Sequence, residues 1–164
     1  MTLIGSWLRF ASFSEIKAEA TRRGILKTDT IPPAIIYKEI TGSELGDILP
    51  SKYILDDKEY WTNRYIRDTK YKLTSLSEII RFLKWNMLNN ENYIAQYYDC
   101  DNFSLQLAAD SQVWTPGLAF GIFDVPGHSK NICVTHDSKV YEIEPQSDGI
   151  SELKPTTQVV LYLV

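Results

Sequence analysis

The chain has 164 residues, of which 44% are hydrophobic, 12% aromatic and 23% charged, with a formal net charge of −4. This length can bury a core without disulfide staples, and the aromatic content excludes a disordered protein. No apolar run approaches the roughly 20 residues of a membrane span, and the start MTLIGSWLRFASF is too short and polar for a secretory signal, so we expect a cytoplasmic protein without a membrane segment.

The two parts of the chain differ in charge. Residues 1–99 hold 14 Lys and Arg against 13 Asp and Glu, whereas residues 100–164 hold 3 against 8, giving net charges of +1 and −5. A nucleic-acid partner is not expected, because no basic stripe is present. We expect a single domain over residues 1–164, made of an N-terminal helical and loop extension (1–50) and a core (51–164).

The first part of the chain predicts short helices separated by loops. SEIKAEATRR, residues 14–23, is typical of a helix between Ser14 as N-cap and Gly24 just past its end. DTIPPAII predicts a loop, because two prolines break both helix and sheet. Residues 43–49 predict a short helix that ends before Pro50. Residues 55–71 show no clean period, and we expect them to be irregular or partly helical.

Two amphipathic helices and a sheet are predicted next. The clearest helix covers residues 73–88, with Ser75 as its cap and Glu78 as the capping-box partner. Its apolar stripe consists of Leu76, Ile79, Ile80, Leu83 and Met87. A second helix is expected over 101–110, with Asp99 near its N-cap. After a turn at 115–117, strands are expected over residues 118–125, 131–135, 140–144 and 159–163, with a hairpin at 135–139. Helices followed by an antiparallel sheet indicate an α+β domain.

Cys100 is placed where the second helix would begin. The unpaired N–H groups and the macrodipole of a first helical turn favour a thiolate. Asp99 and Asp101 on either side oppose it, so a nearby cation would be needed. Cys133 is the only other cysteine, and two cysteines form no framework, which favours a reduced setting. A single disulfide between them is the alternative, and no Cys/His spacing predicts a zinc site.

A thiol nucleophile requires a histidine and an acceptor that orients it. We favour His128, which opens a strand, over His136, which lies in the hairpin tip. If the hairpin turns around residues 136–139, residues whose numbers sum to about 272–275 face each other. Glu144 then lies close to His128. Glu142 lies farther along the strand, and Asn131 is a third possibility.

Each of these residues also has a structural interpretation. A lone cysteine is usually a small buried hydrophobe, and a histidine after Pro-Gly is often a loop residue. Glu142 and Glu144 fit a solvated strand face. The coincidence of a cysteine at a helix start, a histidine opening a strand and a glutamate on the next strand favours a catalytic triad.

The stretch YDCDNFSLQL, followed by TPGLAFGIFDVPGHSKNICVTHDSKVYEIEPQ, resembles the papain-like superfamily. More narrowly, it is similar to the C-terminal domain of the fairy-ring mushroom agglutinin and its relatives, over roughly residues 55–150. The matching motifs are Asp-Cys-Asp-x-Phe at 99–103, His128 and Glu-Pro-Gln at 144–146. The resemblance implies a papain-like fold, in which a Cys-bearing helix packs on a C-terminal antiparallel sheet. It also implies a calcium-dependent cysteine protease that forms a homodimer.

By this resemblance, Cys100 would be the nucleophile, His128 the general base and Glu144 the group that orients the imidazole. Gln96 is the candidate oxyanion donor, with a plain surface glutamine as the alternative. Ca²⁺ would be held by the carboxylates beside the thiol, Asp99 and Asp101, of which Asp99 has the alternative role of N-cap alone.

The sequence departs from the agglutinin in several respects. It is too short to include a ricin-type lectin domain, and its one Gln-x-Trp, at 112–114, predicts no sugar site. The interval from Cys100 to His128 is short, and Asn102 stands where relatives often have aspartate. The NlpC-type cell-wall peptidases share the Asp-Cys element and the Gly-His of 127–128, but usually follow the cysteine with Ser-Gly.

The sequence therefore predicts a thiol hydrolase that cleaves peptide or amide bonds of a peptide or protein substrate. The alternative hypothesis is a non-catalytic papain-like scaffold that binds proteins, as an inhibitor or as a homodimer.

Overall fold

The computed structural model describes residues 30–49, 52–55, 58–61, 63–125, 127–153 and 160–163, and for 52–55, 58–61, 63–64 and 160–163 it describes the backbone alone. Residues Pro32–Val164 form one compact unit. The helix predicted over 14–23 lies outside the described residues, so the single domain over 1–164 stays a prediction.

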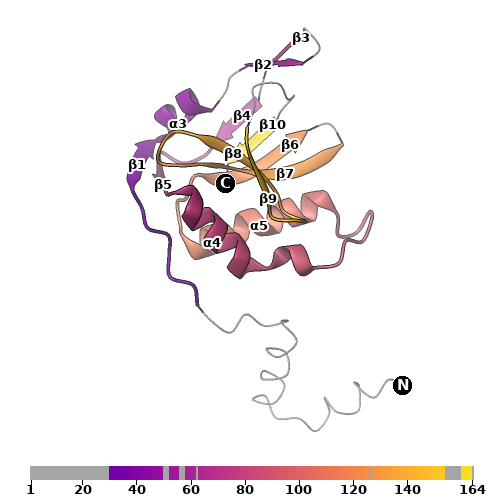
Figure 1. Ribbon diagram of the computed structural model, residues 1–164. Helices are drawn as coiled ribbons and strands as arrows, with labels where there is room; N and C mark the ends of the chain where they lie inside the picture. The colour runs from indigo at the N-terminus through magenta and orange to yellow at the C-terminus, as the bar shows by residue number, and fades with distance from the viewer. Residues whose placement is uncertain are drawn as a thin grey trace, which may run out of the picture. The chain divides into compact units, whose positions relative to one another are not determined.

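The described elements confirm the α+β class (Figure 1). Helices and strands mix along the first part of this unit, and strands follow α5. The elements in chain order are β1 (Lys38–Thr41), α3 (Gly42–Ile48), β2 (Lys52–Leu55), β3 (Lys58–Trp61), β4 (Asn63–Ile66), β5 (Lys70–Leu73), α4 (Leu76–Asn86), η1 (Leu88–Asn90), α5 (Cys100–Trp114), β6 (Phe120–Val125), β7 (His128–Val134), β8 (Val140–Glu144), β9 (Gly149–Glu152) and β10 (Val160–Leu163).

A six-stranded sheet in the order β4-β10-β6-β7-β8-β9 organises the unit. Its neighbouring strands are antiparallel except β10 and β4, which are parallel. The β7–β8 hairpin pairs Asn131 with Ile143 and Val134 with Val140, which is the register expected from the sequence. Two further sheets have two strands each, β1-β5 and β2-β3.

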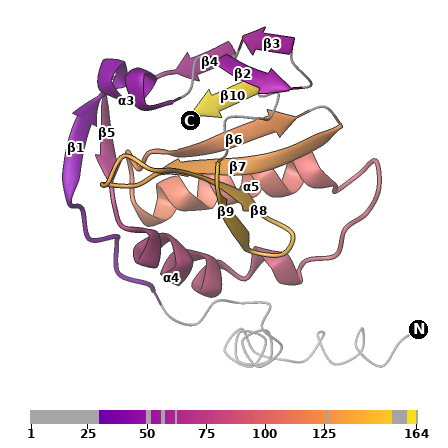
Figure 2. The same cartoon turned by 45° about the horizontal axis from the view of Figure 1, so that its top comes forward.

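The centre of the six-stranded sheet is buried on both faces. Helices α4 and α5 lie along one face (Figures 1 and 2), where the Phe82 ring stacks on Trp114 at 4.7 Å and meets Phe120 edge-on at 6.2 Å. The other face belongs to a core shared with β1, α3 and β5. This core contains Ile40, Leu45, Leu49, Tyr71, Leu73, Ala119, Phe123, Ile132 and Val134.

Helix α4 begins as predicted but uses its acidic residue differently. The Ser75 hydroxyl accepts a hydrogen bond from the Glu78 N–H at 3.3 Å, which caps the helix. The Glu78 carboxylate does not return to Ser75. It accepts from the Ile35 N–H at 3.0 Å and pairs with Arg81 at 2.6 Å. That hydrogen bond with Arg81 lowers the pKa of Glu78.

The burial pattern of α4 corrects the predicted stripe. Ile79 and Leu83 are buried as expected, whereas Ile80 and Met87 are exposed. Phe82, which the predicted stripe left out, is fully buried. The contact with Trp114 explains the difference, because α5 lies on the side of α4 that Phe82 faces.

Residues 32–37 have no helix or strand, in agreement with the loop predicted over 29–36. They are held to α4, to the end of α5 and to the end of β5. The Trp114 indole N–H donates to the Pro32 carbonyl at 2.8 Å, and the Ala34 N–H donates to the Thr115 hydroxyl at 2.8 Å. The Thr74 hydroxyl donates to the Ile35 carbonyl at 2.6 Å. These bonds satisfy backbone groups that no strand partner reaches.

The prediction for residues 55–71 is wrong, because β3, β4 and the start of β5 occupy this stretch. Each strand has only four residues, which is too short for alternation to stand out. Strand β4 pairs with β10, whose residues follow almost 100 positions later, so its partner is not visible locally. Within the described part of the chain, no helix combines the length and apolar composition that crossing a membrane requires.

Replacing Phe82 by Ala should destabilise the protein by about 3–5 kcal/mol, because it leaves a cavity beneath the stacked Trp114 ring. Urea denaturation followed by tryptophan fluorescence measures this change. Val113→Ala is the matched control, since Val113 lies on α5 with 83% of its surface exposed, and it should change stability by less than about 0.5 kcal/mol. A loss below about 1 kcal/mol for Phe82→Ala would contradict the packing described here.

Candidate functional site

The beginning of α5 gathers most of the predicted site residues. Cys100 is the first residue of the helix and Asp99 is its N-cap. The Asp99 N–H donates to Asn102 Oδ1 at 3.2 Å, and Asp99 Oδ2 accepts from the Gln96 N–H at 3.2 Å. The Asn102 side chain therefore caps the first turn of α5. The helix extends to Trp114, four residues beyond the predicted end.

Buried polar groups fasten this first turn to the sheet. The hydroxyls of Ser104 and Ser129 are 2.6 Å apart, and the Ser129 hydroxyl donates to Asp124 Oδ1 at 2.6 Å. The Asn131 amide donates to the carbonyls of Ser104 at 2.8 Å and Gly121 at 3.1 Å. Asn131 thus holds the helix on the strands, and no hydrogen bond joins it to His128.

His128 and Glu144 lie side by side at the end of the sheet. His128 Nε2 is 2.6 Å from Glu144 Oε2, and their side chains are 33% and 26% exposed. Glu142 is engaged elsewhere: it faces Lys130 Nζ at 3.4 Å and accepts from the Ser151 hydroxyl at 2.7 Å. The structure therefore brings Glu144 rather than Glu142 or Asn131 to the imidazole, and the role of this pair stays a prediction.

Cys100 lies at the same end of the α5–β7 contact. It precedes Ser104 by one helical turn, about 6 Å along the axis, and His128 directly precedes Ser129. Among the residues that the structure describes, no hydrogen bond joins the Cys100 thiol to the His128 ring. Of the three predicted triad residues, His128 and Glu144 are hydrogen-bonded to each other.

The two cysteines are free thiols in different surroundings. Cys100 is half-buried, whereas Cys133 is buried. Burial raises the pKa of the Cys133 thiol to about 12. The disulfide considered from the sequence is therefore not present.

The carboxyl groups of Asp99 and Asp101 interact directly. The hydrogen bond to Asp101 raises the pKa of Asp99, and the same bond lowers the pKa of Asp101. A Ca²⁺ ion takes six to eight oxygen ligands, of which these two residues would supply only a part. In the described ranges, no group of three or more His, Cys, Asp or Glu residues is placed to hold a metal ion. Calcium binding by Asp99 and Asp101 stays a prediction.

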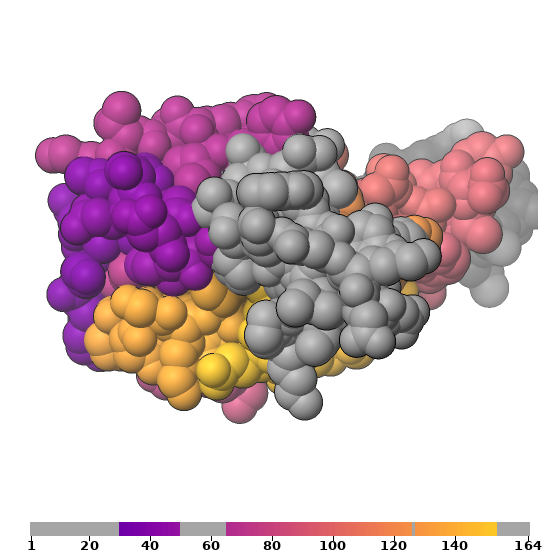
Figure 3. Space-filling model, turned by 90° about the horizontal axis from the view of Figure 1, so that it is seen from above, coloured from indigo at the N-terminus to yellow at the C-terminus, as the bar shows by residue number. Residues whose placement is uncertain are grey.

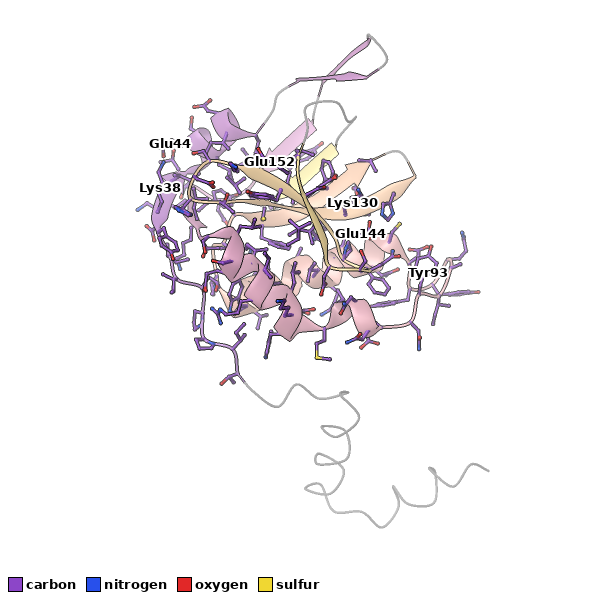
Figure 4. The ribbon with its side chains drawn as sticks, in the orientation of Figure 1. Lys38, Glu44, Tyr93, Lys130, Glu144 and Glu152 are labelled. Carbon is purple, nitrogen blue, oxygen red and sulfur yellow. The ribbon has the colours of Figure 1, made fainter. Side chains whose placement is uncertain are left out.

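The loop that leads into α5, residues 91–99, presents large apolar groups to solvent. Tyr93, Ile94 and Tyr97 are 53%, 54% and 83% exposed. Figure 4 shows Tyr93 on this loop, and in the space-filling view the salmon-coloured segment around it projects from one side (Figure 3). From the sequence alone, this run contributed only to the family resemblance and was not predicted to be a site. Its three tyrosines within six residues, Tyr93, Tyr97 and Tyr98, were the available signal.

This loop has a defined backbone. Two hydrogen bonds of 2.8 Å join Ile94 and Tyr98, each N–H donating to the other carbonyl. Gln96 occupies the turn between them with a φ of 68°, a conformation that non-glycine residues adopt infrequently. The Tyr98 ring packs on Phe103 of α5 at 4.8 Å. Gln96, the predicted oxyanion donor, therefore lies in an exposed turn four residues before Cys100.

Acidic side chains and exposed tyrosines lie close together at the start of α5. Desolvation, followed by the negative charge of the nearby Asp99 carboxylate, raises the pKa of Tyr93. The phenol of Tyr93 therefore lies within electrostatic reach of the first turn of α5. The loop and the carboxyl pair form one surface, which we call the tyrosine–carboxylate surface: Tyr93, Ile94, Tyr97, Asp99 and Asp101.

The single Gln-x-Trp motif is used internally. Gln112 Oε1 accepts from the Gly117 N–H at 3.0 Å, and its amide donates to the Leu118 carbonyl at 3.1 Å. Trp114 is only 5% exposed. These residues brace the turn at 115–117.

No family model matches this sequence, and no curated protein matches it. Solved structures do resemble the chain. One is described as a PSL1a-E64 complex, with a TM-score of 0.57 and 17% sequence identity, covering 76% of this chain and 51% of that chain. Another is the Polyporus squamosus lectin bound to the human-type influenza-binding epitope Neu5Aca2-6Galb1-4GlcNAc, with a TM-score of 0.53 and 19% identity, covering 74% and 49%. At these identities the likeness shows the fold alone, and the chain spans about half the length of those chains.

These comparisons contradict the predicted papain-like cysteine protease and its agglutinin-like kinship. The protein named among the structural neighbours is a lectin with a bound glycan, not a protease. The prediction of hydrolysis through Cys100, His128 and Glu144 is therefore wrong by these comparisons, and they do not support a peptide or protein substrate. The comparisons do not support the alternative of a protein-binding scaffold either. Nothing in the comparisons supports calcium dependence or a homodimer, which stay predictions.

The two thiols should react at very different rates with iodoacetamide at pH 8. With a pKa of about 12, only about one Cys133 in 10,000 is a thiolate at that pH, and its burial also blocks the reagent. Peptide mapping should find label on Cys100 in the native protein and on Cys133 only after unfolding in guanidinium. Equal labelling of both residues in the native protein would contradict the burial of Cys133.

Proposed function

We propose that this domain binds carbohydrate through the tyrosine–carboxylate surface. The observation that carries the proposal is the exposure of Tyr93 and Tyr97 on a loop of fixed backbone beside two carboxyl groups. Buried apolar side chains would serve the core. Aromatic rings that remain exposed on a structured loop are instead typical of a contact surface.

The chemistry of sugars suits these groups. A pyranose ring has an apolar C–H face, which an exposed tyrosine ring can cover while its own hydroxyl stays available for hydrogen bonding. Sugar hydroxyls donate well to carboxylates, and such charge-assisted bonds are shorter and stronger than neutral ones. Tyrosine also provides large contact area with few rotatable bonds to immobilise.

The structural likeness supports the same class of ligand. The lectin that shares this fold is described with a bound saccharide, Neu5Aca2-6Galb1-4GlcNAc. The other neighbour is described as a complex with E64, which provides a second probe of what this fold can bind. The finer form of the fold, papain-like with the Cys-bearing helix on the C-terminal sheet, stays a prediction. The packing of α5 on β6 and β7 is what supports it.

Tyr97→Ala should weaken saccharide binding by about tenfold or more, because it removes the most exposed ring of the surface. Isothermal titration calorimetry with Galβ1-4GlcNAc and with Neu5Acα2-6Galβ1-4GlcNAc measures this change on the full chain. Tyr65→Ala is the matched control, since Tyr65 is 53% exposed on β4, and it should leave the affinity unchanged.

Two results would contradict the proposal. The first is the absence of binding heat with either saccharide up to millimolar concentration. The second is binding that is equally strong in the Tyr97→Ala variant. A response to E64 without a response to either saccharide would assign the fold a different kind of ligand.

A further inference from the structure

Asp124, Ser129 and Ser104 form a chain of close contacts that runs from the sheet to the first turn of α5. Ser129 Oγ lies 2.6 Å from Asp124 Oδ1, and the Ser104 and Ser129 hydroxyl oxygens are 2.6 Å apart. Ser104 Oγ is in turn 3.0 Å from the Asp101 carbonyl oxygen. Ser104 and Ser129 are 0% and 5% exposed, so these contacts depend on hydrogens that the chain itself supplies.

The number of hydrogens decides which of the three contacts are hydrogen bonds. A hydroxyl donates one hydrogen, whereas a backbone carbonyl and an ionised carboxylate only accept. With Asp124 ionised, two hydroxyl hydrogens serve three contacts. The two contacts of 2.6 Å between oxygens need a hydrogen each, so Ser104 donates to Ser129 and Ser129 donates to Asp124. The Asp101 carbonyl then receives no hydrogen from Ser104.

A proton on Asp124 reverses this chain. The carboxylic acid donates to Ser129, Ser129 donates to Ser104, and the Ser104 hydroxyl donates to the Asp101 carbonyl. Three hydrogens now serve three contacts, so every contact is a hydrogen bond. A serine that bonds a carbonyl in the preceding turn of its own helix tends to bend that helix slightly.

We propose that Asp124 is a pH-sensitive positioning residue that acts on the first turn of α5 through Ser129 and Ser104. When Asp124 is ionised, both hydroxyl hydrogens point toward the sheet. When it is protonated, the chain reverses and anchors the Asp101 carbonyl. That turn carries the acidic groups of the tyrosine–carboxylate surface. The inference goes beyond the proposed carbohydrate binding and does not depend on it.

Other titratable groups lie on the elements packed against β6, and the test has to separate them from Asp124. They are His128 and Lys130 on β7, Glu142 and Glu144 on β8, Tyr162 on β10, and Asp99, Cys100 and Asp101 at the start of α5. Those on β7 and β8 pair with one another, as His128–Glu144 and Lys130–Glu142. The groups of α5 titrate on the turn that is observed, so the chain has to be broken elsewhere.

The test follows the Asp101 carbonyl carbon and the Asp124 carboxyl carbon by NMR of the full chain, between about pH 7 and pH 3. An accepted hydrogen bond deshields a carbonyl carbon, so the Asp101 resonance should move downfield with the midpoint of the Asp124 titration. Ser129→Ala should remove that component, because it breaks the chain and leaves the Asp101 carboxyl in place. Asp124→Asn should reproduce the shift at pH 7, since only an amide that donates to Ser129 completes all three bonds.

Asp137→Asn is the matched control. Asp137 also accepts from a hydroxyl, that of Thr135 at 2.6 Å, but it lies in the β7–β8 hairpin. Its replacement should leave the Asp101 carbonyl resonance unchanged. Near-UV circular dichroism verifies that each variant is folded, and the Asp124→Asn measurement at neutral pH decides the question even if acid unfolds the protein.

Two results would overturn the proposal. One is an Asp101 carbonyl titration that is the same in the native sequence and in Ser129→Ala. The other is an Asp101 carbonyl resonance that Asp124→Asn does not move at pH 7. Saccharide binding is measured separately by calorimetry, so its absence would overturn the proposed function and leave this inference standing.

Discussion

The hydrogen-bonded contact between α5 and the strands β6 and β7 is the constraint on which the site depends. The Ser104 and Ser129 hydroxyls form a buried hydrogen bond of 2.6 Å, and the Ser129 hydroxyl donates to the Asp124 carboxylate. The Asn131 amide donates to the Ser104 carbonyl. Buried polar groups are costly unless they are paired, so this network fixes one placement of the helix on the sheet. The first turn of α5 and the loop before it take their position from that placement.

The same contact explains why the two ends of α5 differ. The far end packs through aromatic rings, with Trp114 stacked on Phe82, and is dominated by apolar burial. The near end is polar, half-exposed and acidic, with Asp99, Cys100 and Asp101 at the surface of the first turn. A helix held by its buried residues can present such groups at its start without having to bury their charge.

Much of this local structure could be predicted from the sequence. The stripe and the serine cap located α4, the Asp-Cys-Asp element located the start of α5, and the sheet register followed from the hairpin at 135–139. What it lacked was information that arises only from tertiary contacts. Strand β4 is defined by its pairing with β10, and Glu78 is diverted from its cap by Ile35 and Arg81. Burial of Phe82 and exposure of Tyr97 likewise depend on what packs alongside.

The functional prediction failed for a different reason. A resemblance in short motifs was extended to an activity, although motifs at a helix start and a strand start can persist on a fold whose ligands differ. The proposed carbohydrate binding depends on the tyrosine–carboxylate surface. Amide chemical shifts recorded during titration of the full chain with Galβ1-4GlcNAc test it most directly. We predict that the perturbed resonances cluster in residues 91–101. Perturbations confined to other parts of the chain, or none at all, would contradict the account.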